Sequence, residues 1–170
     1  MTYPPFYTWW YVLHEPNIPP TGRRKNKGAL TELRRAQNLR EVVRCPAYHN
    51  LLSRCEGHTD EASLALAAGV LAHVKGRPSV GQGTPPSFAT QLGTSSEQDK
   101  PLLSGLRFRR LISHEEREDV FRTVVRALSF VDHIAEVEPL ARDLYDWTSP
   151  VRDIPAKWAR DYYRAAPLSL

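Results

Sequence analysis

The sequence contains little cysteine and no long run of apolar residues. Only two of its 170 residues are cysteine, so a framework of several disulfides is excluded, and this scarcity is typical of a reducing compartment. No stretch reaches the roughly 20 apolar residues that a membrane-crossing helix needs. The stretch 1–13 lacks the basic segment of a secretory signal and contains Pro4 and Pro5. Together, these absences predict a cytoplasmic protein.

The sequence also lacks the residue patterns of the common enzyme classes. Gly81 and Gly83 lie in a proline-rich stretch without the lysine of a phosphate-binding loop. His114 is followed four residues later by Glu118, where a zinc protease needs a second histidine. No serine or cysteine lies in a nucleophile motif, and the carboxylates are scattered rather than clustered as in a nuclease. We therefore predict no catalytic residues and no cofactor.

One group of residues has the types that bind metal, in the spacing C-x3-H-x5-C-x2-H. It consists of Cys45, His49, Cys55 and His58, and all four side chains are acceptable zinc ligands. However, Pro46 interrupts the first helical turn, and the spacing matches no common zinc finger. Because cysteine is also an ordinary small core residue, we interpret the group as packing and polar surface and predict no metal.

What the sequence does contain is a series of helical patterns separated by proline and glycine. Hydrophobic residues make up 41% of the chain and charged residues 25%, as in an ordinary folded protein. No run alternates apolar and polar residues for long enough to predict a strand. We therefore predict an all-α fold, a helical bundle. The predicted helices cover 6–14, 29–36, 39–44, 46–54, 62–74, 87–92, 101–112, 115–130, 140–147 and the stretch that follows Pro155.

The loops between residues 76 and 100 are the clearest interruption. They predict an N-terminal helical lobe, 1–92, and a C-terminal helical lobe, 93–170, packed as one compact unit. Helix 62–74 is apolar nearly all round, which predicts a central position in the bundle. Ser87 is expected to cap its helix, and Ser113 with Glu116 has the spacing of a capping box. Helix 101–112 offers four leucines for burial: Leu102, Leu103, Leu106 and Leu111.

Arginine outnumbers lysine by 18 to 5, in a chain whose net charge is only +4. The planar guanidinium group with its several donors suits phosphate. Segment 23–28 is predicted to be a basic loop, and helical spacing places further arginines away from the apolar stripes. We predict that the following residues bind nucleic acid: Arg23, Arg24, Lys25, Lys27, Arg34, Arg35, Arg107, Arg109, Arg110, Arg122 and Arg126. The alternative is that the arginines pair with Glu115, Glu118 and Asp119 on solvated helix faces.

The four tryptophans, Trp9, Trp10, Trp147 and Trp158, allow two interpretations. Aromatic rings can stack on unpaired bases. At helical spacing among apolar neighbours, however, tryptophan is more often a residue of the core or of a subunit interface. We therefore favour the core or an interface.

Five stretches of the sequence agree in order and spacing with one known family. They are GALTELRRA at 28–36, AAGVLAHV at 67–74 with SFATQL at 87–92, LRFRRLI at 106–112, PLARDLYDW at 139–147, and KWARDYY at 157–163. In these stretches the chain resembles the CasB family, the small subunit of the type I-E CRISPR Cascade surveillance complex. The resemblance extends over about residues 6–164, nearly the whole chain.

The resemblance implies a protein of two small helical lobes that acts without catalysis, as a head-to-tail pair of copies in a guide-RNA complex for antiviral defence. Its partners would be the repeated backbone subunits, the large subunit, the guide RNA and the opened target DNA. Arg34 and Arg35, the arginines of 107–110, and Arg122 and Arg126 fall in the family's basic, nucleic-acid-facing segments. The resulting hypothesis is a subunit that binds nucleic acid without sequence preference and stabilises the R-loop and the assembly.

Two other functions remain open from the residues alone. The first is a stand-alone regulator that reads duplex DNA through a helix-turn-helix, with 117–126 as its recognition helix. Such a regulator would show sequence preference in a competition assay, whereas a Cascade subunit would show little. The second is a zinc-stabilised module or enzyme, which metal analysis of the purified protein would reveal.

Overall fold

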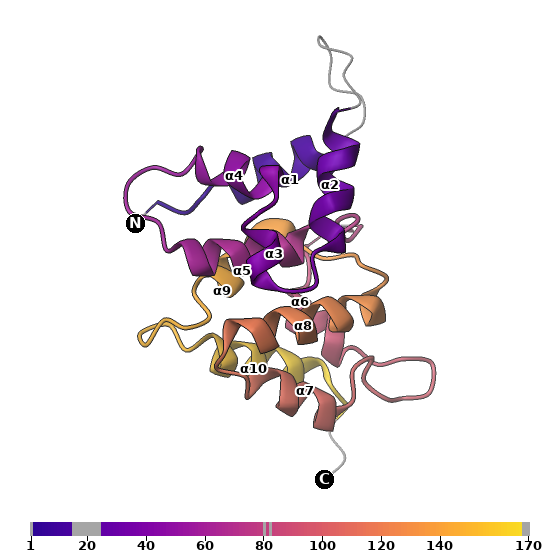
Figure 1. The fold of residues 1–170 in the computed structure, drawn as a ribbon. Coiled ribbons are helices and arrows are strands. Elements are labelled where there is room, and N and C mark those ends of the chain that lie inside the picture. Colours follow the sequence, from indigo (N-terminus) through magenta and orange to yellow (C-terminus); the bar gives the residue numbers. More distant parts are fainter. Residues whose placement is uncertain (1, 15–24, 80, 82, 168–170) are drawn as a thin grey trace.

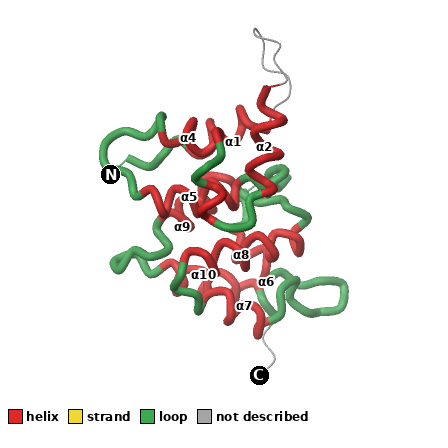
Figure 2. The backbone as a smooth tube through the Cα atoms, in the orientation of Figure 1, coloured by secondary structure: helices red, strands yellow, loops and turns green. Residues whose placement is uncertain are grey.

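The computed structural model describes residues 2–14, 25–79, 81 and 83–167 as helices joined by loops (Figure 2). The α-helices are α1 (Phe6–His14), α2 (Lys25–Arg35), α3 (Leu39–Val42), α4 (Pro46–Leu52), α5 (Glu61–Leu71), α6 (Phe88–Gly93), α7 (Gly105–Ile112), α8 (Arg117–Leu128), α9 (Val137–Tyr145) and α10 (Ile154–Ala165), with one 3-10 helix, η1 (Ser129–Val131). Among the described residues there is no strand, only the isolated bridges Gly76–Ile134 and Ser95–Pro101. The predicted all-α fold is confirmed.

Helix α5 lies in the middle of the bundle (Figure 1). Its residues from Ser63 to Leu71 are all buried, and α3, α4, α8 and α9 pack around it. Asp60 caps it by accepting hydrogen bonds from the backbone N–H groups of Ala62 and Ser63, both at 3.1 Å. A helix without a polar face is stable only when other helices surround it, so its composition determines its place.

A glycine in α5 allows the close approach of two neighbouring helices. A Cβ added to Gly69 would lie 2.8 Å from Cε2 of Phe121 on α8 and 3.0 Å from Cγ2 of Val42 on α3. These distances are shorter than carbon atoms tolerate without movement. The absence of a side chain at this position therefore sets how closely α3 and α8 pack on α5.

A second packing centre joins α6, α7 and α10. Ser87 caps α6 by accepting from the backbone N–H of Thr90 at 3.2 Å, and its hydroxyl donates to Asp161 on α10 at 2.8 Å. The rings of Phe108 on α7 and Tyr162 on α10 stack with their centroids 3.8 Å apart. Tyr162 also donates to the carbonyl of Leu103 at 2.5 Å. These contacts fix α7 against α10.

The helices on either side of residue 92 pack against each other. Helix α6 packs on α10, and α5 packs on α8 and α9. In Figure 1, α1, α2 and α4 lie at one end of the molecule, and α7 lies at the other with α10 beside it. The division into lobes 1–92 and 93–170 stays a prediction.

Several predicted helix ends are wrong. Helix α2 begins at Lys25, so 25–28 is helical rather than a loop, and α9 begins at Val137 because Pro139 is tolerated within a first helical turn. The predicted capping box is absent: the Ser113 hydroxyl donates to the Arg110 carbonyl at 2.8 Å, and Glu116 makes no side-chain cap. Ser113 thus ends α7 instead of starting α8.

Helix α7 begins at Gly105, not at Pro101, and is capped by Ser104. In this helix Phe108 and Leu111 face the core, and Leu106 is 63% exposed rather than buried. Two residues before Phe108, at 100° per residue, Leu106 lies on nearly the opposite side of the helix. The prediction that all four leucines are available for burial is therefore wrong for Leu106.

Candidate nucleic-acid interface

Helices α7 and α8 pack against each other and carry five of the predicted arginines, all of them exposed. On α7, Arg107, Arg109 and Arg110 are exposed, while Phe108 is fully buried. On α8, Arg122 and Arg126 are exposed, one helical turn apart. We refer to these five exposed residues together as the α7–α8 basic surface, although Arg109, two residues after Arg107, lies on nearly the opposite side of α7, near Tyr162 of α10.

The arginines of α7 form no ion pair with any carboxylate among the described residues. The Arg107 guanidinium lies over the Phe130 ring, with Cζ 5.7 Å from the ring centroid. Its neighbour Arg109 is close enough to Tyr162 for its charge to oppose the rise that burial causes in the pKa of that phenol. Unpaired guanidinium groups remain available to a phosphate, so this helix has the free donors that phosphate binding needs.

The arginines of α8 differ from each other. Nη2 of Arg122 lies 3.5 Å from a carboxylate oxygen of Glu118, and the same carboxylate accepts a hydrogen bond from the backbone N–H of Leu39 at 3.1 Å. Arg126 has no such partner within the described part of the chain. The interpretation as a solvated ion pair therefore fits Arg122, while Arg126 resembles the arginines of α7.

The predicted residues on α2 lie apart from this surface. Helix α2 packs against α1 and α4, at the end of the molecule away from α7 (Figure 1). Arg34 is half-buried, and its Nε donates to the carbonyl of Ala72 at 2.6 Å, whereas Arg35 is exposed. Lys25 and Lys27 belong to the first turn of α2, and Arg23 and Arg24 lie outside the described residues.

Two apolar side chains near the arginines are exposed, which the sequence did not predict. Phe130 was expected at the end of a helix, but it lies on η1 and is 37% exposed, next to Arg107. Leu106, the residue before Arg107, is also exposed. No sequence signal distinguishes them from the buried apolar residues around them, because their exposure depends on where α7 begins and where α8 ends.

The four indoles are buried, and each N–H has a partner. Trp9 and Trp10 donate to the carbonyls of Ala47 and Val74 at 3.0 and 2.9 Å. Trp147 donates to the carbonyl of His114 at 2.9 Å, and Trp158 donates to the carboxylate of Asp143 at 2.8 Å. The interpretation as core residues is confirmed.

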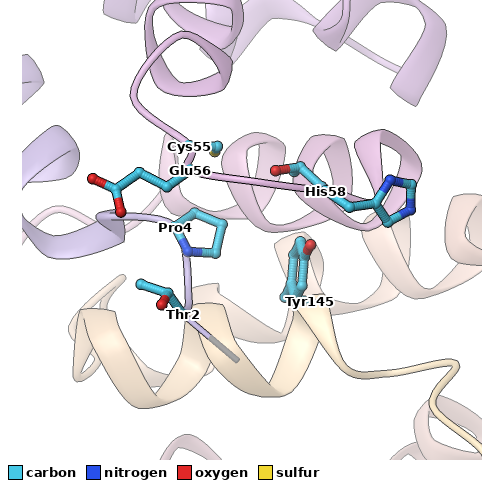
Figure 3. A pocket seen from close by; sticks show the side chains of 7 residues that line it. Thr2, Pro4, Cys55, Glu56, His58 and Tyr145 are labelled. Carbon is cyan, nitrogen blue, oxygen red and sulfur yellow. The ribbon is translucent and has the colours of Figure 1, made fainter.

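The two cysteines and His49 of the metal-like spacing each bond a different backbone carbonyl, that of His49 belonging to Val43. The thiols of Cys45 and Cys55 donate to the carbonyls of Glu41 and Leu51, at 3.3 and 3.4 Å, and burial raises the pKa of both thiols. Cys55 and His58 both line a cavity of about 210 Å³, and the His58 ring points away from Cys55 (Figure 3). Across 2–14, 25–79, 81 and 83–167, no three His, Cys, Asp or Glu side chains gather as a metal ion requires.

The N-terminus of α8 is not arranged like that of a recognition helix. The Arg117 guanidinium binds Asp60 at 3.2 Å, the Ser63 hydroxyl at 3.2 Å and the Thr148 hydroxyl at 2.9 Å. A recognition helix presents its N-terminal side chains to base edges, whereas this arginine ties α8 to α5 and to the loop after α9. Separately, no helix among the described residues is long and apolar enough to span a bilayer.

Comparisons with known proteins identify a family and a similar fold. The model of the family described as CRISPR-associated protein Cse2 matches residues 29–163, a range that includes α7 and α8. No curated protein matches the sequence. A chain in the crystal structure of E. coli Cascade bound to a PAM-containing dsDNA target has the same fold, with a TM-score of 0.71 at 16% identity. The match covers 96% of this chain and 97% of that chain.

Proposed function

This chain belongs to the Cse2 family of CRISPR-associated proteins, the CasB small-subunit family that its sequence resembles, and from that premise we propose that it is the non-catalytic small subunit of a type I-E Cascade complex. In this role it binds guide RNA and target DNA strands through the α7–α8 basic surface, without reading sequence. It contacts the backbone subunits and the large subunit, and it associates head to tail with a second copy.

The observation that best supports nucleic-acid binding is that the α7 arginines are exposed and have no carboxylate partner among the described residues. Arg107, Arg109 and Arg110 are exposed on one short helix and make no ion pair with the described carboxylates. An arginine already paired to a carboxylate must give up that partner to bind phosphate, whereas these arginines need not. The stack of Phe108 on Tyr162 anchors this helix to α10, so the backbone that carries the three arginines is fixed before a strand binds.

Such a surface would shift the equilibrium between duplex DNA and the guide–target heteroduplex, which is nearly balanced. When a guide pairs with one DNA strand, the heteroduplex that forms is about as stable as the duplex that it replaces. Contacts to the sugar–phosphate backbone then decide whether the opened state persists. Arginines that hold a strand by its phosphates stabilise the R-loop for any sequence.

The test is charge reversal on α7 within the assembled complex. The R107E/R110E variant is co-expressed with guide RNA and the other Cascade subunits, and target-DNA binding is measured across a salt titration. We expect the variant to co-purify in the assembly and to bind DNA more weakly. The slope of log Kd against log salt falls by roughly 0.7 for each phosphate of a single strand that the variant no longer neutralises.

The matched control reverses two arginines elsewhere. Arg44 and Arg54 are exposed, flank α4 and lack carboxylate partners in the described chain. R44E/R54E makes the same change in net charge, and we expect the salt slope of the unaltered protein. Equal slopes for R107E/R110E and the unaltered protein, or a chain that stays a free monomer in co-expression, would overturn the proposed function.

A further inference from the structure

We propose that Phe130 is a base-stacking residue, which gives the α7–α8 basic surface a preference for an unpaired strand over duplex DNA. The proposal rests on the nucleic-acid role above and adds to it the form of nucleic acid that the surface takes. Its starting point is the position of the ring. Phe130 is 37% exposed between the buried Leu128 and Val131, and the Arg107 guanidinium lies over one face of its ring.

The backbone that carries the ring is held in an unusual conformation. Asp132 and His133, which follow η1 directly, both have left-handed backbone angles, with φ of 54° and 60°. Residues other than glycine rarely adopt this region, and Asp and His do so more often than most. The chain therefore makes a defined turn directly after the helical segment that carries the ring.

Hydrogen bonds fix this turn on both sides. The backbone N–H of His133 donates to the Leu128 carbonyl at 2.9 Å, and the N–H of Lys75 donates to the His133 carbonyl at 2.8 Å. The His133 ring also bonds the carbonyl of His73 through Nδ1 at 3.1 Å. The turn is thus tied to the C-terminal end of α8 and to the segment after α5. Binding of a strand should therefore cost little conformational entropy in this turn.

The chemistry of the neighbours favours a single strand. An aromatic ring beside arginines can take a base on its face while the arginines hold the adjoining phosphates, and a guanidinium plane also stacks on bases. In a duplex the bases are already stacked on each other, so only the phosphates are available to this surface.

The test compares F130L with the unaltered full-length protein, alone and in the assembled complex. Leucine keeps an apolar side chain of similar size but has no flat face. We expect F130L to weaken binding of a mixed-sequence single strand at least about fivefold, with no change in affinity for the matched duplex. On an abasic strand of equal length, both proteins bind equally, because only the phosphates remain. Affinities are measured by fluorescence anisotropy.

Y11L is the matched control, because Tyr11 on α1 is 45% exposed and lies away from α7. We expect it to bind the single strand as the unaltered protein does. Unchanged single-strand affinity in F130L, or an equal loss on duplex, overturns the stacking role. Loss of F130L from the assembly with normal strand binding also overturns it, since the ring would then contact a protein subunit. If R107E/R110E still weakens DNA binding in those cases, the proposed function stands; if neither variant does, both proposals fail.

Discussion

His73, just after α5, is a half-buried histidine whose buried Nε2 atom has no hydrogen-bond partner among the described residues. Burial, and then the nearby charges of Arg34, His133 and Lys75, lower its pKa to about 4. Burial also lowers the pKa of His14. Both residues therefore favour the folded state only while they are neutral.

This arrangement predicts that stability falls as the solution becomes acidic. An unfolded histidine has a pKa of about 6.5, so the unfolded chain takes up protons first as the pH drops below that value. The free energy of unfolding should be fully retained above pH 6.5 and should decrease between about pH 6.5 and 4. Each pKa unit of difference corresponds to about 1.4 kcal/mol for a fully buried group, and partial exposure of the His73 ring reduces this. Thermal unfolding at a series of pH values measures the effect.

The variant H73Q isolates the contribution of this residue. It removes the titrating group but keeps a polar side chain of similar length. Its melting temperature should change less between pH 7 and 4.5 than that of the unaltered protein. A chain whose stability rises over this range, or an H73Q profile parallel to the original, contradicts the assignment.

Adjacent arginines show what single-residue patterns cannot predict. In sequence Arg34 and Arg35 are equivalent members of one basic pair, yet Arg34 donates to the Ala72 carbonyl and Arg35 is exposed. The difference depends on where the end of α5 lies relative to α2, which is a property of the tertiary structure and not of the local sequence. By contrast, the buried indoles could be predicted, because large aromatic groups at helical spacing usually lie in a core.

At the scale of elements, the surroundings of Gly69 on α5 and Gly93 on α6 show how closely the neighbouring helices pack. We expect G69A to lower the free energy of unfolding by about 1–3 kcal/mol, because Cβ would collide with Phe121 and Val42 in the core. G93A should cost more, because its Cβ would overlap the backbone carbonyl oxygen of Tyr162, which cannot rotate away. Urea unfolding followed by circular dichroism measures both values.

The same substitution in α2 provides the control. A Cβ at Gly28 meets nothing within 4 Å, and alanine is the better helix former by about 1 kcal/mol. G28A should therefore stabilise the protein, in contrast to the other two variants. If G69A and G93A behave like G28A, the close helix contacts at α5 and α10 are not as described.

The sequence predicted which segments are helical and which helix is central more readily than it predicted the residues at which helices begin and end. The apolar character of 62–74 indicated a central helix, and α5 is central. Ser87 was predicted as a cap and is one. The Ser113 and Glu116 pair failed because a serine at the end of one helix has the same spacing to the next helix as a true N-cap. Only the chain path after Ile112 separates the two cases.

At the scale of the whole molecule, the modest net charge of +4 conceals an uneven distribution. Around α9 and the start of α10 three basic groups are paired: Arg142 with Glu138, Arg152 with Asp146 and Lys157 with Asp143. Further along α10, Arg160 and Arg164 are exposed and have no carboxylate partner among the described residues. On α7 no arginine has such a partner in the described chain. Composition predicted a phosphate-binding protein, but only the fold separates paired arginines from unpaired ones.

This distribution predicts that the position of a charge, and not the net charge, determines DNA binding. R107Q/R110Q and R142Q/R152Q each remove two positive charges. We expect the first to weaken DNA binding and to lower the salt slope, and the second to leave both unchanged. R142Q/R152Q should instead reduce the free energy of unfolding by on the order of 1 kcal/mol, because Arg142 and Arg152 lie over the Tyr3 ring and Arg152 pairs with the buried Asp146. A salt titration and a urea titration of the same two proteins distinguish the outcomes. Equal reductions of DNA affinity in both variants would mean that the molecule attracts nucleic acid by its overall charge and has no dedicated face.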